Sequence, residues 1–138
     1  MKTLIYAALL LCMFASSNLL AADEKENKAV EAAKAWLTLV DSEKYNESWD
    51  AAAEYFRNAV KKDKWQEMVS PIRKPLGKLV SREIDTKTYA TELPGAPDGE
   101  YYILQFKSSF ENKKSAVETV TVMLEKDGSW KAAGYFIK

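Results

Sequence analysis

The spacing of apolar residues first predicts helices. Apolar side chains recur every three or four residues from about Asp23–Asn27 to Asp41, which is typical of an amphipathic helix. A third helix is expected to begin at Asp63, as its N-cap, and to end at Pro75 and Gly77. Between these two helices, the same spacing predicts a second helix, whose apolar residues are Trp49, Ala52, Ala53, Phe56 and Val60.

After Gly77 the spacing changes to the two-residue alternation of β-strands. Turn-forming residues at 93–99 and 111–114, and Asp127-Gly128, separate the alternating segments, so consecutive strands form hairpins. Helices followed by strands predict an α+β fold, with three helices packed on one face of a four-stranded antiparallel sheet. The four strands are expected at 79–89, 101–110, 116–125 and 130–137.

The alternation also predicts which side chains face the helices. In the first strand Val80, Arg82, Ile84, Thr86 and Thr88 share a face, and in the other strands the even-numbered residues are expected to point inward. The opposite face would then carry an apolar surface of the kind that closes a homodimer. Its members are Tyr101, Ile103, Val117, Met123, Tyr135 and Ile137.

The N-terminus has the order of a secretory signal peptide. Lys2 precedes an apolar run that is too short to span a bilayer, and a polar break at 16–18 follows. Cleavage after Ala21 or Ala22 is the expected processing step. We therefore predict a signal peptide at 1–22, a single α+β domain at 23–138, and a periplasmic or secreted protein without a membrane span after cleavage.

Composition narrows the chemistry of the mature chain. The sequence has no histidine, and its one cysteine, Cys12, lies in the predicted leader. The commonest general base and the softest metal ligands are therefore missing, and we expect no metal and no cofactor. Lys2 is the only charged residue of the leader, so the mature chain carries 19 basic and 20 acidic side chains, and nothing indicates nucleic-acid binding.

Several segments carry a resemblance to known families. The last hairpin, 120–135, resembles the final hairpin of nuclear-transport-factor-2-like (cystatin-like) domains. Together with the segments named below, it is similar to an exported bacterial family known as domain of unknown function 4019. The resemblance implies export and a cone-shaped fold in which the antiparallel sheet is curved, but no catalytic residue and no ligand. The segments are 35–41, 45–49, 73–77, 81–82, 93–101 and 110–114.

A cone-shaped fold would leave a cavity between the sheet and the helices, and polar residues on the inner face are its candidate ligand contacts. Arg82 and Glu118 could hold an anionic or hydrogen-bonding ligand, or they could form a structural ion pair. We expect truncation of Arg82 to destabilise the protein more than truncation of Arg73. Aromatic side chains could line the cavity or simply fill the core; the candidates are Tyr45, Trp49, Tyr102 and Trp130.

These observations favour a non-catalytic binding module. It would bind a small ligand in the cavity or an envelope protein through the sheet. The alternative is a small periplasmic enzyme, an isomerase, dehydratase or hydrolase, that uses inward acids and tyrosines such as Glu118 and Tyr102. The sequence leaves open the ligand, the oligomeric state and whether the cavity is open or filled.

Overall fold

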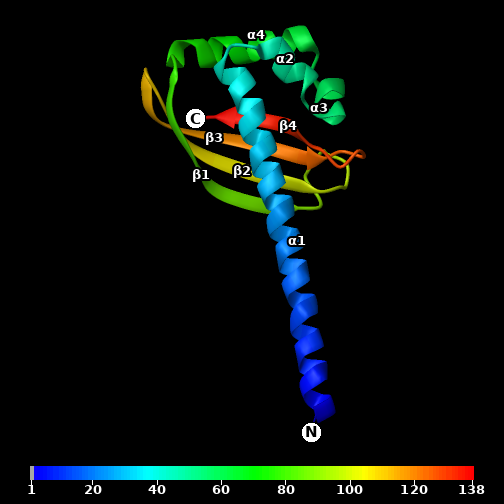
Figure 1. Cartoon of the computed structure of the whole chain (residues 1–138). Helices are drawn as coiled ribbons and strands as arrows, with labels where there is room; N and C mark the ends of the chain where they lie inside the picture. Colours follow the sequence, from blue (N-terminus) through cyan, green and yellow to red (C-terminus); the bar gives the residue numbers. More distant parts are fainter. Residues whose placement is uncertain (1) are drawn as a thin grey trace.

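The computed structural model describes the backbone of residues 2–138 and the side chains of residues 19–138. Figure 1 shows one long helix crossing a four-stranded sheet, with the shorter helices gathered near the C-terminal end of the long helix. The helices are α1 (Lys2–Asp41), α2 (Tyr45–Asp50), α3 (Glu54–Ala59), α4 (Lys62–Arg73) and the 3-10 turn η1 (Lys74–Leu76). The strands are β1 (Leu79–Ala90), β2 (Tyr101–Phe110), β3 (Lys113–Leu124) and β4 (Trp130–Ile137).

The predicted α+β class and the antiparallel sheet are confirmed. The strands lie in the order β1-β2-β3-β4, and each pairs antiparallel with the next. Alternation places a buried row of even-numbered side chains on β2 and β3, because successive residues of a strand face opposite sides. These side chains meet the apolar face of α1, which contributes Ala33, Leu37 and Val40 to the core.

The N-terminal half of α1 extends away from the sheet (Figure 1). Two ion pairs tie α1 to the sheet region: the ammonium of Lys25 lies 2.6 Å from Glu100, just before β2, and Glu26 lies 2.8 Å from Lys87 on β1. The predicted signal peptide covers residues 1–22, and the side chains of residues 1–18 lie outside the described part, so this assignment stays a prediction. In the described residues, no helix is both long and apolar enough to cross a membrane.

The prediction of one helix through residues 49–60 is wrong, because two short helices occupy this stretch. Ala53 separates them with extended backbone angles, φ −60° and ψ 148°. Its N–H donates a hydrogen bond of 2.8 Å to the carbonyl of Ala132 on β4. A long-range bond to the sheet edge therefore interrupts a segment whose local spacing favours a continuous helix.

The predicted cap of the next helix is also wrong. α4 begins one residue before Asp63, after Lys61, and no side chain caps it. The Asp63 carboxylate instead accepts the N–H of the adjacent Lys64. The predicted end is close to the observed one, since Gly77 takes a φ of 73° that favours glycine and turns the chain into β1.

Bulges change the predicted faces of the two edge strands. In β1 the register shifts between Ile84 and Thr86, so Thr86 and Thr88 leave the inner face and Lys87 and Tyr89 replace them. A second shift in β1 leaves Val80 66% exposed.

A corresponding shift in β4 brings Tyr135 opposite Val120 and Ile137 opposite Glu118. Both side chains therefore lie on the inner face, and their assignment to the outer face is wrong.

The outer face is less available than the sequence suggests. Tyr101 points outward, yet it is 1% exposed, and its hydroxyl donates to the carbonyl of Pro97 in the loop before β2. At the β4 edge of the sheet, Met68, Ile72 and Phe136 are exposed apolar side chains beside a groove between α4 and β4. The homodimer stays a prediction.

The packing of α1 predicts a difference between two leucines of the same helix. Leu37 is fully buried and Leu39 is half-buried. Leu37→Ala should lower the free energy of unfolding by about 2–5 kcal/mol, because it leaves a cavity against the sheet. The matched control Leu39→Ala should cost clearly less, and urea denaturation measures both. Equal losses would contradict the observed orientation of α1.

Candidate functional site

Four charged side chains meet between the helices and the sheet. Asp41 is the last residue of α1, Arg73 is the last residue of α4, Arg82 lies on β1 and Glu118 lies on β3. Glu118 is completely buried, and the side chains of both arginines are at least nine-tenths buried. We call these four residues the buried ion network, and its formal charges cancel.

Arg82 joins the two acids of the network. Its terminal nitrogens lie 2.7 and 2.9 Å from the two oxygens of Asp41, which makes a bidentate pair. Its Nε donates to Glu118 Oε1 at 2.8 Å. The sequence-based expectation that Arg82 and Glu118 point inward as a pair agrees with this geometry, and Asp41 is a partner that the sequence analysis missed.

Arg73 belongs to the same network and is as deeply buried as Arg82. One terminal nitrogen donates to Asp41 at 2.7 Å, the other donates to the Tyr135 hydroxyl at 3.3 Å, and the guanidinium stacks 4.7 Å from the ring of Phe110. Its Nε–H has no acceptor in the described part of the chain. The reason for expecting Arg73 to matter less than Arg82 is therefore removed.

The carboxylate of Glu118 is fully engaged. Oε1 accepts from Arg82 and from the Ser108 hydroxyl at 2.6 Å, and Oε2 accepts from the Tyr135 hydroxyl at 2.5 Å. Ser108 lies on β2 and Tyr135 on β4, so all four strands contribute to the site. A buried acid with this many donors is compensated for the water that it has lost.

Electrostatics hold Asp41 and Tyr135 in one protonation state at neutral pH. Burial alone would raise the pKa of Asp41, but hydrogen bonds from Arg82 and Arg73 outweigh it and the pKa lies below its usual value. Burial, together with the nearby Glu118 carboxylate, raises the pKa of Tyr135 far above its usual value. Tyr135 therefore remains a hydrogen-bond donor at neutral pH.

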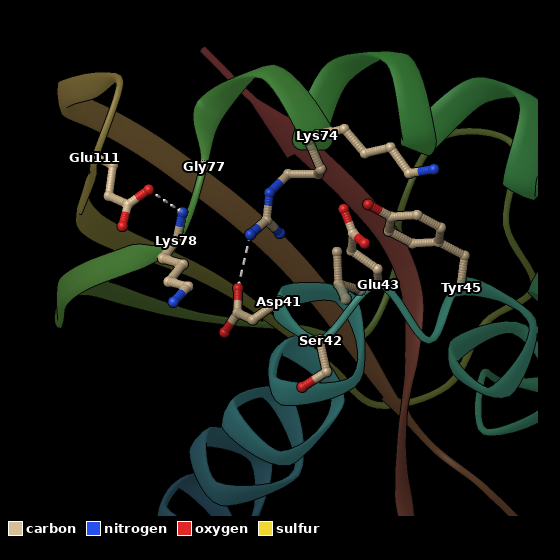
Figure 2. A pocket seen from close by; sticks show the side chains of 10 residues that line it. Asp41, Ser42, Glu43, Tyr45, Lys74, Gly77, Lys78 and Glu111 are labelled. Atoms are coloured by element: carbon tan, nitrogen blue, oxygen red, sulfur yellow. Dashed lines mark hydrogen bonds and ion pairs between the residues drawn. The ribbon is translucent and has the colours of Figure 1, made fainter.

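A pocket of about 330 Å³ opens beside the network, where the end of α1 meets η1 and the start of β1. Figure 2 shows Tyr45 and Lys74 on one side of this pocket and Lys78 and Glu111 on the other. Asp41 and Arg73 connect the pocket to the network. We call it the α1–η1 pocket; its other lining residues are Val40, Ser42, Glu43 and Gly77.

Three charged groups and one hydroxyl of the α1–η1 pocket have no side-chain partner within residues 19–138. No carboxylate lies within 4.0 Å of the ammonium groups of Lys74 and Lys78, and no cation lies that close to Glu43. The Tyr45 hydroxyl makes no hydrogen bond inside this part of the protein, although its residue is buried. The pocket therefore offers donors and acceptors of both charges.

The structure separates the six candidate ligand contacts. Arg82 and Glu118 lie in the network and Tyr45 lines the α1–η1 pocket, whereas Trp49 donates its indole N–H to the carbonyl of Val60. At the opposite end of the strands, Tyr102 packs edge-on against Trp130. The suggested combination of Glu118 with Tyr102 is therefore not formed, and the tyrosine that contacts Glu118 is Tyr135.

Among the described residues, no group of three or more acidic, histidine or cysteine side chains is arranged to hold a metal ion. The network instead pairs each acid with an arginine. The arrangement can organise hydrogen bonds, but both of its carboxylates are already occupied.

Comparison with known proteins adds a family. Residues 32–135 match the model of the family described as protein of unknown function DUF4019. The chain belongs to this family. Searches of curated proteins and of solved structures found no match. The matched segment of DUF4019 includes Asp41, Arg73, Arg82, Glu118 and Tyr135, and so contains the whole buried ion network.

The network predicts a large stability loss on truncation of one arginine. Arg82→Ala should lower the free energy of unfolding by about 3–5 kcal/mol, because Glu118 then keeps a buried charge without its main partner. Lys107→Ala, which removes a surface pair with Asp85 at 3.8 Å, should cost less than about 1 kcal/mol. Chemical denaturation at pH 7 compares them, and similar small losses would contradict the network.

The depressed pKa of Asp41 predicts acid sensitivity. Because its folded pKa lies below its unfolded value, the pairs of Asp41 stabilise the protein above about pH 4, and this stabilisation disappears as the pH falls through the folded pKa. The difference in unfolding free energy between the wild type and Asp41→Asn should be about 3–5 kcal/mol at pH 7. It should shrink below about pH 4, as measured by denaturation at a series of pH values. A difference that persists unchanged to pH 2 would contradict this assignment.

Proposed function

We propose that the protein is an exported, non-catalytic binding module that holds a small polar ligand in the α1–η1 pocket. The observation that carries the proposal is the set of unpaired polar groups around this pocket, next to a network whose own charges cancel. Tyr45 is buried although its hydroxyl has no partner within residues 19–138, and folded proteins usually satisfy buried polar groups internally. Glu43, Lys74 and Lys78 are exposed around the same concavity. Polar groups that converge on one concavity are suited to orient a ligand.

The geometry of the network favours binding over catalysis. A general acid or base must exchange a proton with its substrate. Both oxygens of Glu118 accept hydrogen bonds from protein donors, and both oxygens of Asp41 accept from arginines. The enzyme alternative would have to break these bonds before either acid could act.

The lining of the pocket indicates what kind of ligand would fit. Lys74 and Lys78 can each donate to an anionic or carbonyl oxygen, and Glu43 can accept from a hydroxyl or amine. Because these groups lie around one opening of about 330 Å³, a small molecule with both donors and acceptors suits it better than an apolar one. Arg73, with its remaining Nε–H, lies at the back of the site.

Export is part of the same proposal. The leader at 1–22 carries the signal-peptide pattern, and the ion pairs of α1 with Glu100 and Lys87 are made by Lys25 and Glu26, beyond the leader. Removal of the leader would leave these contacts in place. Within residues 2–138, the order of four α-helices followed by a four-stranded antiparallel meander also supports the nuclear-transport-factor-2-like fold.

Native mass spectrometry of the protein purified from the envelope fraction of its own host tests this function. The wild type should carry a bound small molecule, and the double variant Lys74→Gln/Lys78→Gln should lose it. The matched control is Lys61→Gln/Lys126→Gln, which removes the same charge from exposed positions away from the pocket. The control should keep the ligand.

The same spectra report the mature N-terminus, expected at Ala22 or Asp23. A wild type without ligand, or a ligand held equally by the pocket variant, would overturn the proposed site. An N-terminus still at Met1 in the envelope fraction would overturn cleavage of the leader.

A further inference from the structure

A second concavity lies on the other side of the buried ion network, over the outer face of the sheet. It measures about 430 Å³ and lies where β1, β2 and β3 run side by side. In the register, Ser81 lies opposite Ser109, and Glu83 lies opposite Lys107. We call this concavity the serine hollow; its lining residues are Ser81, Arg82, Glu83, Lys107, Ser108, Ser109, Lys114, Ser115, Ala116 and Val117.

Two bulges shape the hollow. β1 places the extra residue Val80 between Leu79 and Ser81, while their partners on β2 are consecutive. On the other side of β2, two residues, Lys114 and Ser115, lie opposite the single residue Ser109. Bulges bend a strand and increase its local twist, so a pair of them around one residue gives this end of the sheet a specific hollowed shape.

The hollow is lined by hydrogen-bond donors that the protein does not use. The hydroxyls of Ser81, Ser109 and Ser115 make no hydrogen bond within residues 19–138, in contrast to Ser108, which donates to Glu118. Lys114 has no carboxylate within 4.0 Å in this part of the chain, and the ammonium of Lys107 lies 3.8 Å from its nearest one, on Asp85. The lining thus carries two ammonium groups and one exposed acid, Glu83, and Lys114 is the ammonium without a nearby carboxylate.

The sheet itself forms the floor of the hollow at Arg82 and Ser108. These two residues lie opposite each other, and their side chains point to the inner face, where Arg82 binds Asp41 and Glu118 and Ser108 donates to Glu118. The floor is therefore held in place by the buried ion network behind it. Hydroxyl and ammonium donors arranged around a concavity are well matched to a group with several acceptor oxygens and a negative charge.

We propose that the serine hollow binds a tetrahedral oxyanion group, such as a phosphate or sulfate, through Lys107, Lys114 and the three free serine hydroxyls. This site is separate from the α1–η1 pocket and does not depend on the proposed ligand there. The oxyanion can be a free ion or the charged end of a larger envelope molecule. The shared recognition chemistry is the oxyanion itself.

Titration of the isotope-labelled protein, followed by amide chemical shifts, tests the proposal. The probes are inorganic phosphate, sulfate and acetate, each at constant ionic strength set with sodium chloride. Phosphate and sulfate should shift the amides of Ser81, Ser109 and Ser115 with saturation, and the planar acetate should bind more weakly. Glycerol phosphate distinguishes a monoester end group from a free ion, since tighter binding than inorganic phosphate indicates the former.

Variants locate the site. Lys107→Gln/Lys114→Gln should weaken phosphate binding by about tenfold or more, because two charge-assisted contacts are lost. Lys61→Gln/Lys126→Gln, with the same change in net charge, should stay within about twofold. Arg82 is left intact because its loss would disturb the fold.

Other results would overturn the proposal. Shifts of equal size with sodium chloride alone would indicate general ionic effects, and equal weakening by both double variants would indicate non-specific attraction. Saturable shifts confined to Tyr45, Lys74 and Lys78 would assign oxyanion binding to the α1–η1 pocket, which would support the ligand site proposed there and remove this one.

Discussion

The structure depends on Asp41, because this one carboxylate connects elements that are distant in the sequence. It lies at the end of α1 and accepts from Arg73 at the end of α4 and from Arg82 on β1. Through Arg82 the connection reaches Glu118 on β3. A buried ion pair does not by itself increase stability over apolar packing, but it penalises arrangements that separate its partners. The network therefore fixes the direction of α1 across the sheet.

The position of the network explains why both concavities lie at the same end of the molecule. The core between α1 and the sheet is filled by apolar and aromatic side chains. At the end where α1 stops and α4 turns into β1, the interior is instead filled by charged side chains that bond one another. Lys74, Lys78 and Lys114, at the rims of the two concavities, have no carboxylate within 4.0 Å among residues 19–138. The two proposed binding sites thus lie where the apolar packing ends.

The sequence predicts the parts of this fold that depend on local pattern. Two-residue alternation identifies the strands, and the predicted bounds of β4 agree with the structure because Asp127-Gly128 marks its start. The inward direction of Glu118 follows from its neighbours Val120 and Val122. Arg82 could be placed for the same reason, since it lies before the bulge at Asp85.

The remaining errors come from interactions between distant residues. The bulge in β4 adds one residue, so every later side chain of the strand faces the opposite side of the sheet. The local alternation does not reveal this bulge, and it therefore predicts the wrong face for Tyr135 and Ile137. The break at Ala53 depends on Ala132, which lies in another element. Arg73 lies four residues after Val69 and eight after Trp65, on the buried face of α4, but a charged residue at the end of a helix is ordinarily exposed. A net charge balance between Asp41, Glu118 and two arginines can be recognised only after the topology brings them together.

The chemistry of the network also determines how constant the site is. The chain has no histidine, so no side chain has an ordinary pKa near neutrality. Burial alone would lower the pKa values of Arg73 and Arg82, but their neighbours Tyr135, Asp41 and Glu118 raise them overall. The pKa of Asp41 is lowered and that of Tyr135 is raised. Each of these shifts moves a titration away from neutral pH, so Asp41, Arg73 and Arg82 keep their charges and Tyr135 stays neutral around neutral pH. For the exported binding module that we propose, this constancy would keep the architecture behind the site independent of the pH of the surroundings.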